Sequence, residues 1–203
     1  MFTKVITNPK LRSFVRKTGI IKILTRILSK RNSVYEERFS KALFQSINEG
    51  DVVWDVGANI GYYTCKFAHA VGSSGKVVAF EPVKATYLRM VAACKNEGLS
   101  NVLPVQYALG SCEEQIKIPI TNKNDGTTNS LAKRSDNSTD VYELVSVKRG
   151  DTVIAEGLPM PDIIKIDVEA YEEEVLFGLR NYLQSCAWGG GKMLKINILR
   201  NSF

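Results

Sequence analysis

Short apolar runs alternate with longer amphipathic segments through the middle of the 203-residue chain. The apolar runs predict buried strands, and the segments between them have the spacing of helices with one apolar face. The predicted strands are Val52–Val56, Lys76–Phe80 and Val102–Tyr107, and the predicted helices are Gly61–Val71 and Lys84–Glu97. Strands that alternate with helices in this way favour an α/β fold with a mostly parallel sheet and helices on both faces.

The alternation changes after Leu109. Two further strands, Gln115–Ile120 and Val141–Val147, follow each other with no helical pattern between them. The residues that separate them, Thr121–Asp140, are rich in Asn, Ser, Thr, Asp and Gly. This composition predicts a long polar loop, and loops of that length in compact domains are usually mobile or functional.

The C-terminal part returns to the earlier pattern and then stops. We predict a buried strand over Asp162–Val168, a helix over Glu169–Leu183 and at most one more strand over Met193–Leu199. Three consecutive glycines, Gly189–Gly191, precede that last strand.

The first 34 residues differ from the rest in charge. Nine basic residues and no acid precede Glu36, so the remaining chain has 18 of the 27 bases against 21 acids. Apolar spacing predicts a basic amphipathic helix over Leu11–Leu28 and a second helix over Tyr35–Asn48. The first helix either packs on the domain with its lysines in solvent or contacts an anionic membrane, and we favour packing. We therefore divide the chain into a helical segment, residues 1–34, and one domain, residues 35–203, atypical from about residue 185.

Charge and composition exclude several classes of protein. The formal charge of +6 comes from the N-terminal segment, so the body of the chain does not predict nucleic-acid binding. No apolar run approaches the roughly 20 residues that span a bilayer, and basic residues interrupt the apolar ones near the N-terminus. Four scattered cysteines and one histidine do not make a usual zinc set. We expect no metal site, no signal peptide and a cytoplasmic location with reduced thiols; the pattern predicts no oligomeric state.

The turn after the first strand carries the strongest functional signal. Residues 55–61 read D-V-G-A-N-I-G, and Glu81 ends the next strand 20 residues after Gly61. Glycines at 57 and 61 let the backbone turn tightly and approach a ligand. A carboxylate at the tip of the second strand suits the two hydroxyls of a ribose. These positions predict a site for an adenosine-containing cofactor.

Two details favour S-adenosylmethionine over a dinucleotide. Asn59 stands where the G-x-G-x-x-G turn has its second glycine, and Gly61 comes one residue early. Asp55 would repel a pyrophosphate but would attract the ammonium group of a ligand. S-adenosylmethionine has that ammonium group and a ribose, and it has no pyrophosphate.

Four segments resemble the motifs of the FkbM family of S-adenosylmethionine-dependent methyltransferases in sequence, order and spacing: DVGANIGYYT, AFEP, VQYALG and IIKIDVEAYE. The resemblance covers roughly residues 35–183, and the last motif is more specific than the first. It implies a Rossmann-like class I methyltransferase fold and O-methylation of a hydroxyl on a sugar, glycan or related metabolite. The cofactor-binding positions that it implies are Asp55, Gly57, Asn59, Gly61, Glu81 and the neighbourhood of Ala108.

Asp167 and Glu169 are the candidate catalytic residues. They follow a strand that should lie beside the first one, so their side chains should emerge where the methyl donor binds. Transfer to a hydroxyl needs proximity and often a base that takes the proton. The two acids could supply that base, or they could bind a divalent cation through their oxygens. Glu169 has an alternative interpretation, because an acid at the start of a helix is favourable there without any role in catalysis.

The chain departs from the family pattern at two places. Ala170 stands where the signature has glycine, which should cost little unless the backbone needs a positive φ. Class I methyltransferases continue through three strands after the strand that carries Asp167, whereas only Met193–Leu199 can be drawn here. We therefore expect truncated C-terminal strands.

Two other functions stay open at this point. A truncated chain could be an inactive methyltransferase-like protein, and an NAD(P)-dependent oxidoreductase is a weaker alternative. For an active enzyme we expect a small-molecule or glycan acceptor and no nucleic-acid partner.

Overall fold

The computed structural model describes residues 40–120, 141–168, 170–188 and 194–198. The chain divides into two compact units, Met1–Gln45 and Ser46–Phe203. Residues 40–45 are helical, within the predicted helix Tyr35–Asn48. The predicted helix Leu11–Leu28 and the predicted loop Thr121–Asp140 lie outside the described residues. The predicted boundary between residues 34 and 35 stays a prediction.

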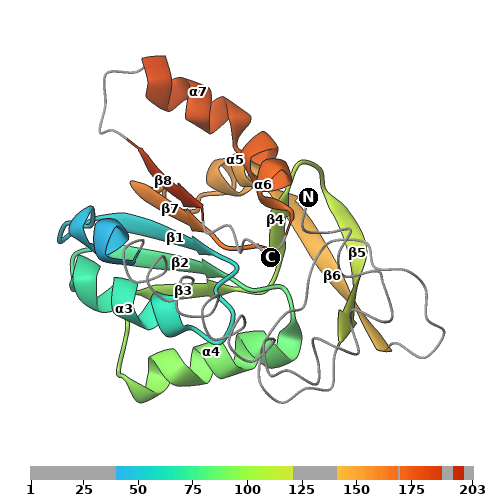
Figure 1. Cartoon of the computed structure of the whole chain (residues 1–203), viewed down its shortest axis with the longest axis horizontal. Helices are drawn as coiled ribbons and strands as arrows, with labels where there is room; N and C mark the ends of the chain where they lie inside the picture. Colours follow the sequence, from blue (N-terminus) through green and yellow to red (C-terminus); the bar gives the residue numbers. More distant parts are fainter. Residues whose placement is uncertain (1–39, 121–140, 169, 189–193, 199–203) are drawn as a thin grey trace, which may run out of the picture. The chain divides into compact units, whose positions relative to one another are not determined.

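The central sheet of the larger unit has five strands, all parallel (Figure 1). Their order across the sheet is β3-β2-β1-β7-β8. The strands are β1 (Val52–Val56), β2 (Lys76–Phe80), β3 (Val102–Val105), β7 (Ile163–Ile166) and β8 (Lys195–Ile198). The order reverses between β1 and β7, and doubly wound folds bind their ligands at the carboxyl ends of the strands at such a point.

Helices cover both faces of this sheet (Figure 1). Helices α3 (Tyr62–Val71) and α4 (Lys84–Asn96) lie on one face. Helices α5 (Gly150–Ala155), α6 (Glu172–Gly178) and α7 (Arg180–Trp188) lie on the other. The predicted α/β fold with a mostly parallel sheet is confirmed.

The core has one layer on each face of the sheet, because successive side chains along a strand point to opposite faces. On the α5–α7 face, buried side chains of β1, β2 and β7 pack on Leu109, Val153, Val175 and Leu179. On the α3–α4 face, Ala79 packs on the cluster of small and sulfur-containing side chains Ala58, Cys65, Met90 and Cys94. Asp55 follows Trp54 on β1, so its side chain points to the opposite face of the sheet, which α3 and α4 cover.

A second sheet has three strands in the order β4-β6-β5. Strands β5 (Glu114–Ile120) and β6 (Val141–Arg149) pair antiparallel. They correspond to the two strands that were predicted after Leu109. Strand β4 (Ala108–Gly110) pairs parallel with the end of β6 and was not predicted. Pro119 of β5 and Tyr142 of β6 are register partners in this antiparallel pair.

Several predicted boundaries differ from the structure. The predicted single helix Glu169–Leu183 is wrong, because α6 ends at Gly178 and α7 begins at Arg180. At the break the chain is tightly packed: a β-carbon on Gly178 would overlap the carbonyl oxygen of Gly110, and Leu179 is completely buried. Helix α5 was missed, since it has six residues and begins at a glycine. The predicted strands Val102–Tyr107 and Asp162–Val168 are shorter than expected.

The predicted last strand is confirmed as β8, which pairs parallel with β7. Residues 199–203 lie outside the described part, so the predicted truncation of the C-terminal strands stays a prediction. Within the described residues, no helix is both long and apolar enough to cross a membrane.

Candidate active site

The turn after β1 is fastened to the end of β2. The backbone N–H groups of Gly57 and Ala58 both donate to the carbonyl of Phe80, at 3.1 and 3.0 Å. The N–H of Asn59 donates to Oε2 of Glu81 at 3.0 Å. Gly61 then closes the turn by donating to the carbonyl of Ala58 at 3.0 Å. The predicted turn and the predicted acid therefore form one hydrogen-bonded unit.

Both glycines of the turn are needed for their backbone conformation and for space. Gly57 has φ +76°, and a β-carbon there would overlap the carbonyl oxygen of Asp167. Gly61 has φ +89°, and its β-carbon would lie 3.1 Å from Cγ of Met90. Asn59, at φ 51°, is one of two described non-glycine residues with positive φ. Asn tolerates this left-handed conformation better than most residues do.

Glu81 is a nearly buried carboxylate at the tip of β2. Its Oε1 accepts the N–H of Val83 at 3.0 Å, and its Oε2 accepts the N–H of Asn59. Burial raises the pKa of Glu81 to about 7, although both hydrogen bonds act in the opposite direction. Each carboxylate oxygen has two lone pairs, so each can still accept a hydrogen bond from a ligand hydroxyl.

Asp55 is completely buried and already has two partners within the protein. Its Oδ2 accepts the hydroxyl of Thr64 at 2.6 Å. Its Oδ1 accepts the ammonium group of Lys165 at 2.9 Å. Asp55 and Lys165 are register partners on β1 and β7, so both side chains lie on the face that α3 covers.

Lys165 was not singled out from the sequence. Its Nζ also donates to the carbonyl of Gly57 at 3.1 Å and lies 3.5 Å from Oδ2 of Asp167. Burial lowers the pKa of Lys165, but the negative charges of Asp55 and Asp167 more than offset this, so the pKa lies above its usual value. One feature of the sequence could have identified it: Lys165 is a lysine between two isoleucines in a strand that was predicted to be buried.

Asp167 follows β7 at the same edge of the sheet. Its N–H donates to the carbonyl of Val56 at 3.0 Å, and its side chain is 31% exposed. The structure therefore places Asp167 beside the glycine turn, as the sequence predicted, with part of its carboxylate open to solvent.

The remaining predicted positions are less central. Ala108 begins β4 and is buried. Glu169 lies outside the described residues. Ala170 has φ 56°. A positive φ is the condition under which alanine in place of glycine is costly, so the substitution costs stability here.

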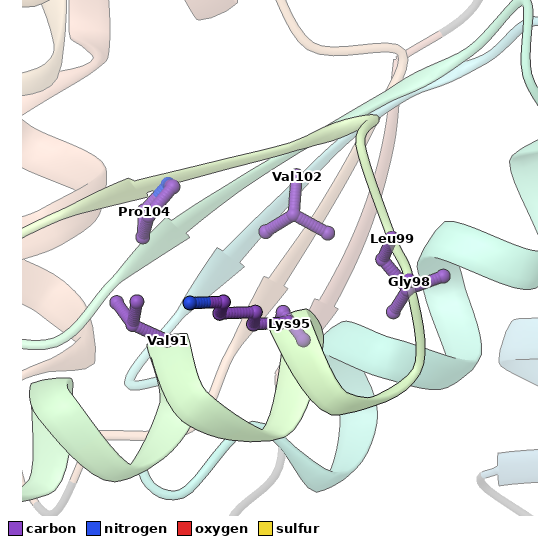
Figure 2. A pocket seen from close by; sticks show the side chains of 7 residues that line it. Val91, Lys95, Gly98, Leu99, Val102 and Pro104 are labelled. Carbon is purple, nitrogen blue, oxygen red and sulfur yellow. The ribbon is translucent and has the colours of Figure 1, made fainter.

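A groove elsewhere on the domain does not coincide with this site. It has a volume of about 280 Å³ and lies between α4 and β3 (Figure 2). Val91 and Lys95 of α4 face Val102 and Pro104 of β3 across it. Val102 is the first residue of its strand, whereas Gly57, Glu81 and Asp167 follow the carboxyl ends of theirs. We therefore assign the candidate site from the converging polar groups and not from this groove.

Comparison with known proteins gives the family. The sequence profile of the methyltransferase FkbM domain matches residues 55–189. The chain is 32% identical over 151 residues to hexuronic acid methyltransferase AglP of Haloferax volcanii, an alignment that covers 74% of this chain and 59% of that protein. The chain thus spans less than two thirds of that relative's length.

Solved structures with partial similarity include the following two. A SAM dependent methyltransferase from Aquifex aeolicus has a TM-score of 0.43 at 17% identity, covering 82% of this chain and 67% of that chain. Fibrillarin of Aeropyrum pernix, solved with bound S-adenosyl-L-methionine, has a TM-score of 0.40 at 13% identity, covering 66% and 40%. The profile match over residues 55–189 decides the assignment: the chain belongs to the FkbM methyltransferase family.

Proposed function

We propose that this protein is an S-adenosylmethionine-dependent methyltransferase that methylates a hydroxyl of a sugar, glycan or related metabolite. The observation that supports this most is the hydrogen bond from the N–H of Asn59 to Glu81. It joins the glycine turn and the acid of the second strand into one unit, at the point where the strand order reverses. Asp167 lies at the same edge, beside Gly57.

The hydrogen bonds of the turn favour S-adenosylmethionine over a dinucleotide. A pyrophosphate needs backbone N–H groups that point at it. The N–H groups of Gly57, Ala58, Asn59 and Gly61 all donate within the protein. Glu81 in contrast keeps lone pairs for ligand hydroxyls, as a ribose would need. The chemistry of these groups fits a nucleoside without a pyrophosphate.

Each predicted residue has a proposed role toward this cofactor. Glu81 accepts hydrogen bonds from the ribose hydroxyls, and the Gly57 to Gly61 turn, with Asn59, shapes the backbone against the nucleoside. Asp55 supports the turn from behind, and Ala108 lines the adenine side. When bound, S-adenosylmethionine supplies an electrophilic methyl group.

Asp167 is the proposed base. Its partly exposed carboxylate can accept the proton that the acceptor hydroxyl loses during transfer. Glu169 is proposed as a second acid near the acceptor, from its sequence position alone. The name of the Haloferax volcanii relative, a hexuronic acid methyltransferase, supports an acidic sugar as the proposed acceptor.

Titration calorimetry with S-adenosylhomocysteine and with NAD tests the cofactor. We expect binding of S-adenosylhomocysteine, weakened about 10- to 100-fold in Glu81→Gln, because a carboxylate that accepts hydrogen bonds contributes more than a neutral amide. Glu156→Gln is the matched control, since Glu156 pairs with Lys148 on the surface. Binding of NAD without S-adenosylhomocysteine would contradict the proposal.

Transfer of a labelled methyl group tests the acceptor. Glycosides of hexuronic acids should become labelled and the matching neutral hexosides should not. Asp167→Asn should lower kcat while leaving the Kd for S-adenosylhomocysteine within about threefold, because a base acts in the transfer step. Equal labelling of acidic and neutral sugars would remove the hexuronic acid assignment but not the methyltransferase assignment.

A further inference from the structure

The Lys165 ammonium group joins three segments of the candidate site. We infer that Lys165 is a positioning residue, which holds the turn after β1 and the Asp167 side chain in one arrangement. Asp55 then contributes to ligand binding through Lys165 and not by touching the ligand. The inference rests on the proposed function, because it assigns how the same site is held.

The burial of Asp55 excludes direct contact with a ligand in this conformation. Its side chain has no exposed surface, and both oxygens are engaged, by Thr64 at 2.6 Å and by Lys165 at 2.9 Å. The sequence analysis paired Asp55 with an ammonium group of the ligand. In the structure the ammonium group that Asp55 binds is that of Lys165. An effect of Asp55 on binding must pass through the groups that it touches.

Lys165 has one polar partner on each of the three segments. An ammonium group has three protons. That of Lys165 donates to Oδ1 of Asp55 on β1 at 2.9 Å and to the carbonyl of Gly57 in the turn at 3.1 Å, and it forms an ion pair with Oδ2 of Asp167 after β7 at 3.5 Å. The ring of Tyr63 on α3, with its centroid 5.4 Å from Nζ, lies on the same buried side.

Stability alone does not account for this lysine. A buried ion pair is often no more stabilising than apolar side chains of similar volume, because both charges lose their hydration. Lys165 is completely buried in a strand whose other residues are isoleucines, so exposure to solvent does not call for a charge at this position. What the ammonium group adds is a fixed geometry between the turn and Asp167, which an apolar side chain cannot supply.

A charge-balanced double variant separates positioning from charge compensation. Lys165→Met alone would leave Asp55 buried without a partner and could unfold the domain. Asp55→Asn with Lys165→Met removes both buried charges. We expect this variant to melt near the wild-type temperature yet to bind S-adenosylhomocysteine about 10- to 100-fold more weakly, since small misplacements at a site have effects of this size. Wild-type affinity in a folded double variant would overturn the inference.

Thr64→Val is the matched control. It removes the other hydrogen bond to Asp55, at Oδ2, and leaves Lys165 in place. We expect its affinity for S-adenosylhomocysteine to stay within about twofold of wild type. A loss as large as that of the double variant would overturn the inference, because it would assign the effect to Asp55 without Lys165.

NMR of the wild-type protein gives a test that needs no variant. The Lys165 ammonium group should give a resonance in slow exchange with water, assigned through contacts of the side chain with the Tyr63 ring. That resonance should shift when S-adenosylhomocysteine saturates the protein. Saturation without a shift would overturn the inference.

Failure of the proposed function would be visible separately. If the wild type binds no S-adenosylhomocysteine, the proposed function fails, and hydrogen exchange then decides the positioning role. The Gly57 and Asn59 amides should exchange faster in the double variant than in Thr64→Val. Equal exchange rates in the two variants would overturn the positioning role.

Discussion

Gly57 and Asp167 lie so close together that a β-carbon on Gly57 would overlap the carbonyl oxygen of Asp167. The contact joins the end of β1 to the end of β7, the two strands between which the strand order reverses. The glycine of the turn is therefore required by the protein itself, whatever ligand the turn binds.

Gly57→Ala should destabilise the domain by about 2–5 kcal/mol. A left-handed alanine costs about 1–2 kcal/mol, and forced overlap in a packed region adds about 1–3 kcal/mol. Urea unfolding measures the change. Gly98→Ala is the matched control, because Gly98 has a similar φ of +69° and nothing within 4 Å of its β-carbon position. If both variants lose the same stability, the contact with Asp167 contributes nothing.

Ala170→Gly should stabilise the domain by about 0.5–1 kcal/mol. Ala170 has φ 56°, and glycine relieves the left-handed strain at the cost of some chain entropy. The same exchange at the exposed, helical Ala92 of α4 should instead cost about 1 kcal/mol. Relative to wild type, the melting temperature should rise in Ala170→Gly and fall in Ala92→Gly. A loss of stability in both variants would contradict the assigned backbone strain.

Glu81 should make the stability of the domain depend on pH. The pKa rises from 4.5 to about 7 on folding, so the folded state holds the proton more tightly than the unfolded state. The stability that follows from this is fully present below pH 4.5 and is lost as the pH rises through about 7. The loss amounts to at most about 3 kcal/mol.

Glu81→Gln removes this dependence and provides the check. Relative to wild type, the variant should gain stability between pH 4.5 and pH 8, as measured by urea unfolding at both values. Glu156→Gln should run parallel to wild type over the same range, because its carboxylate is half exposed. If the stabilities of Glu81→Gln and wild type change equally with pH, burial does not disfavour the charged form of Glu81.

Cys65 should resist alkylation in the folded protein. Burial raises the pKa of Cys65 to about 12, and its sulfur lies 3.8 Å from that of Cys94, whose pKa is also raised. At pH 8 only about one Cys65 in ten thousand is then a thiolate, the reactive form. Iodoacetamide followed by mass spectrometry should label the exposed Cys112 first and Cys65 only after unfolding. Early labelling of Cys65 would contradict the packing of α3 on α4.

The strands of the site were predictable because their signals are local. Val52–Val56 and Lys76–Phe80 were predicted to the residue, since each is a short apolar run that ends at a turn. The closeness of the glycine turn to Glu81 also follows from this order, because parallel strands bring their carboxyl ends to the same edge. The hydrogen bond from Asn59 to Glu81 was not predicted.

The parts that were missed depend on contacts between distant segments. Gly178, the last residue of α6, packs against the backbone of Gly110, and no local pattern at residue 178 reveals this contact. The role of Lys165 depends on the register of β1 with β7, which pairs it with Asp55. The sequence contained an unusual lysine but not the identity of its partner.

The separation of Asp55 and Lys165 along the chain has a consequence for synthesis. Their hydrogen bond joins residues 110 positions apart, so the site is complete only after most of the domain has been made. Contacts between such distant residues form late, because a long loop must close first. Until then Asp55 remains a hydrated carboxylate at the end of a strand with one neighbour. A nascent chain released before residue 165 therefore lacks the lysine that joins β1, the turn after it and Asp167.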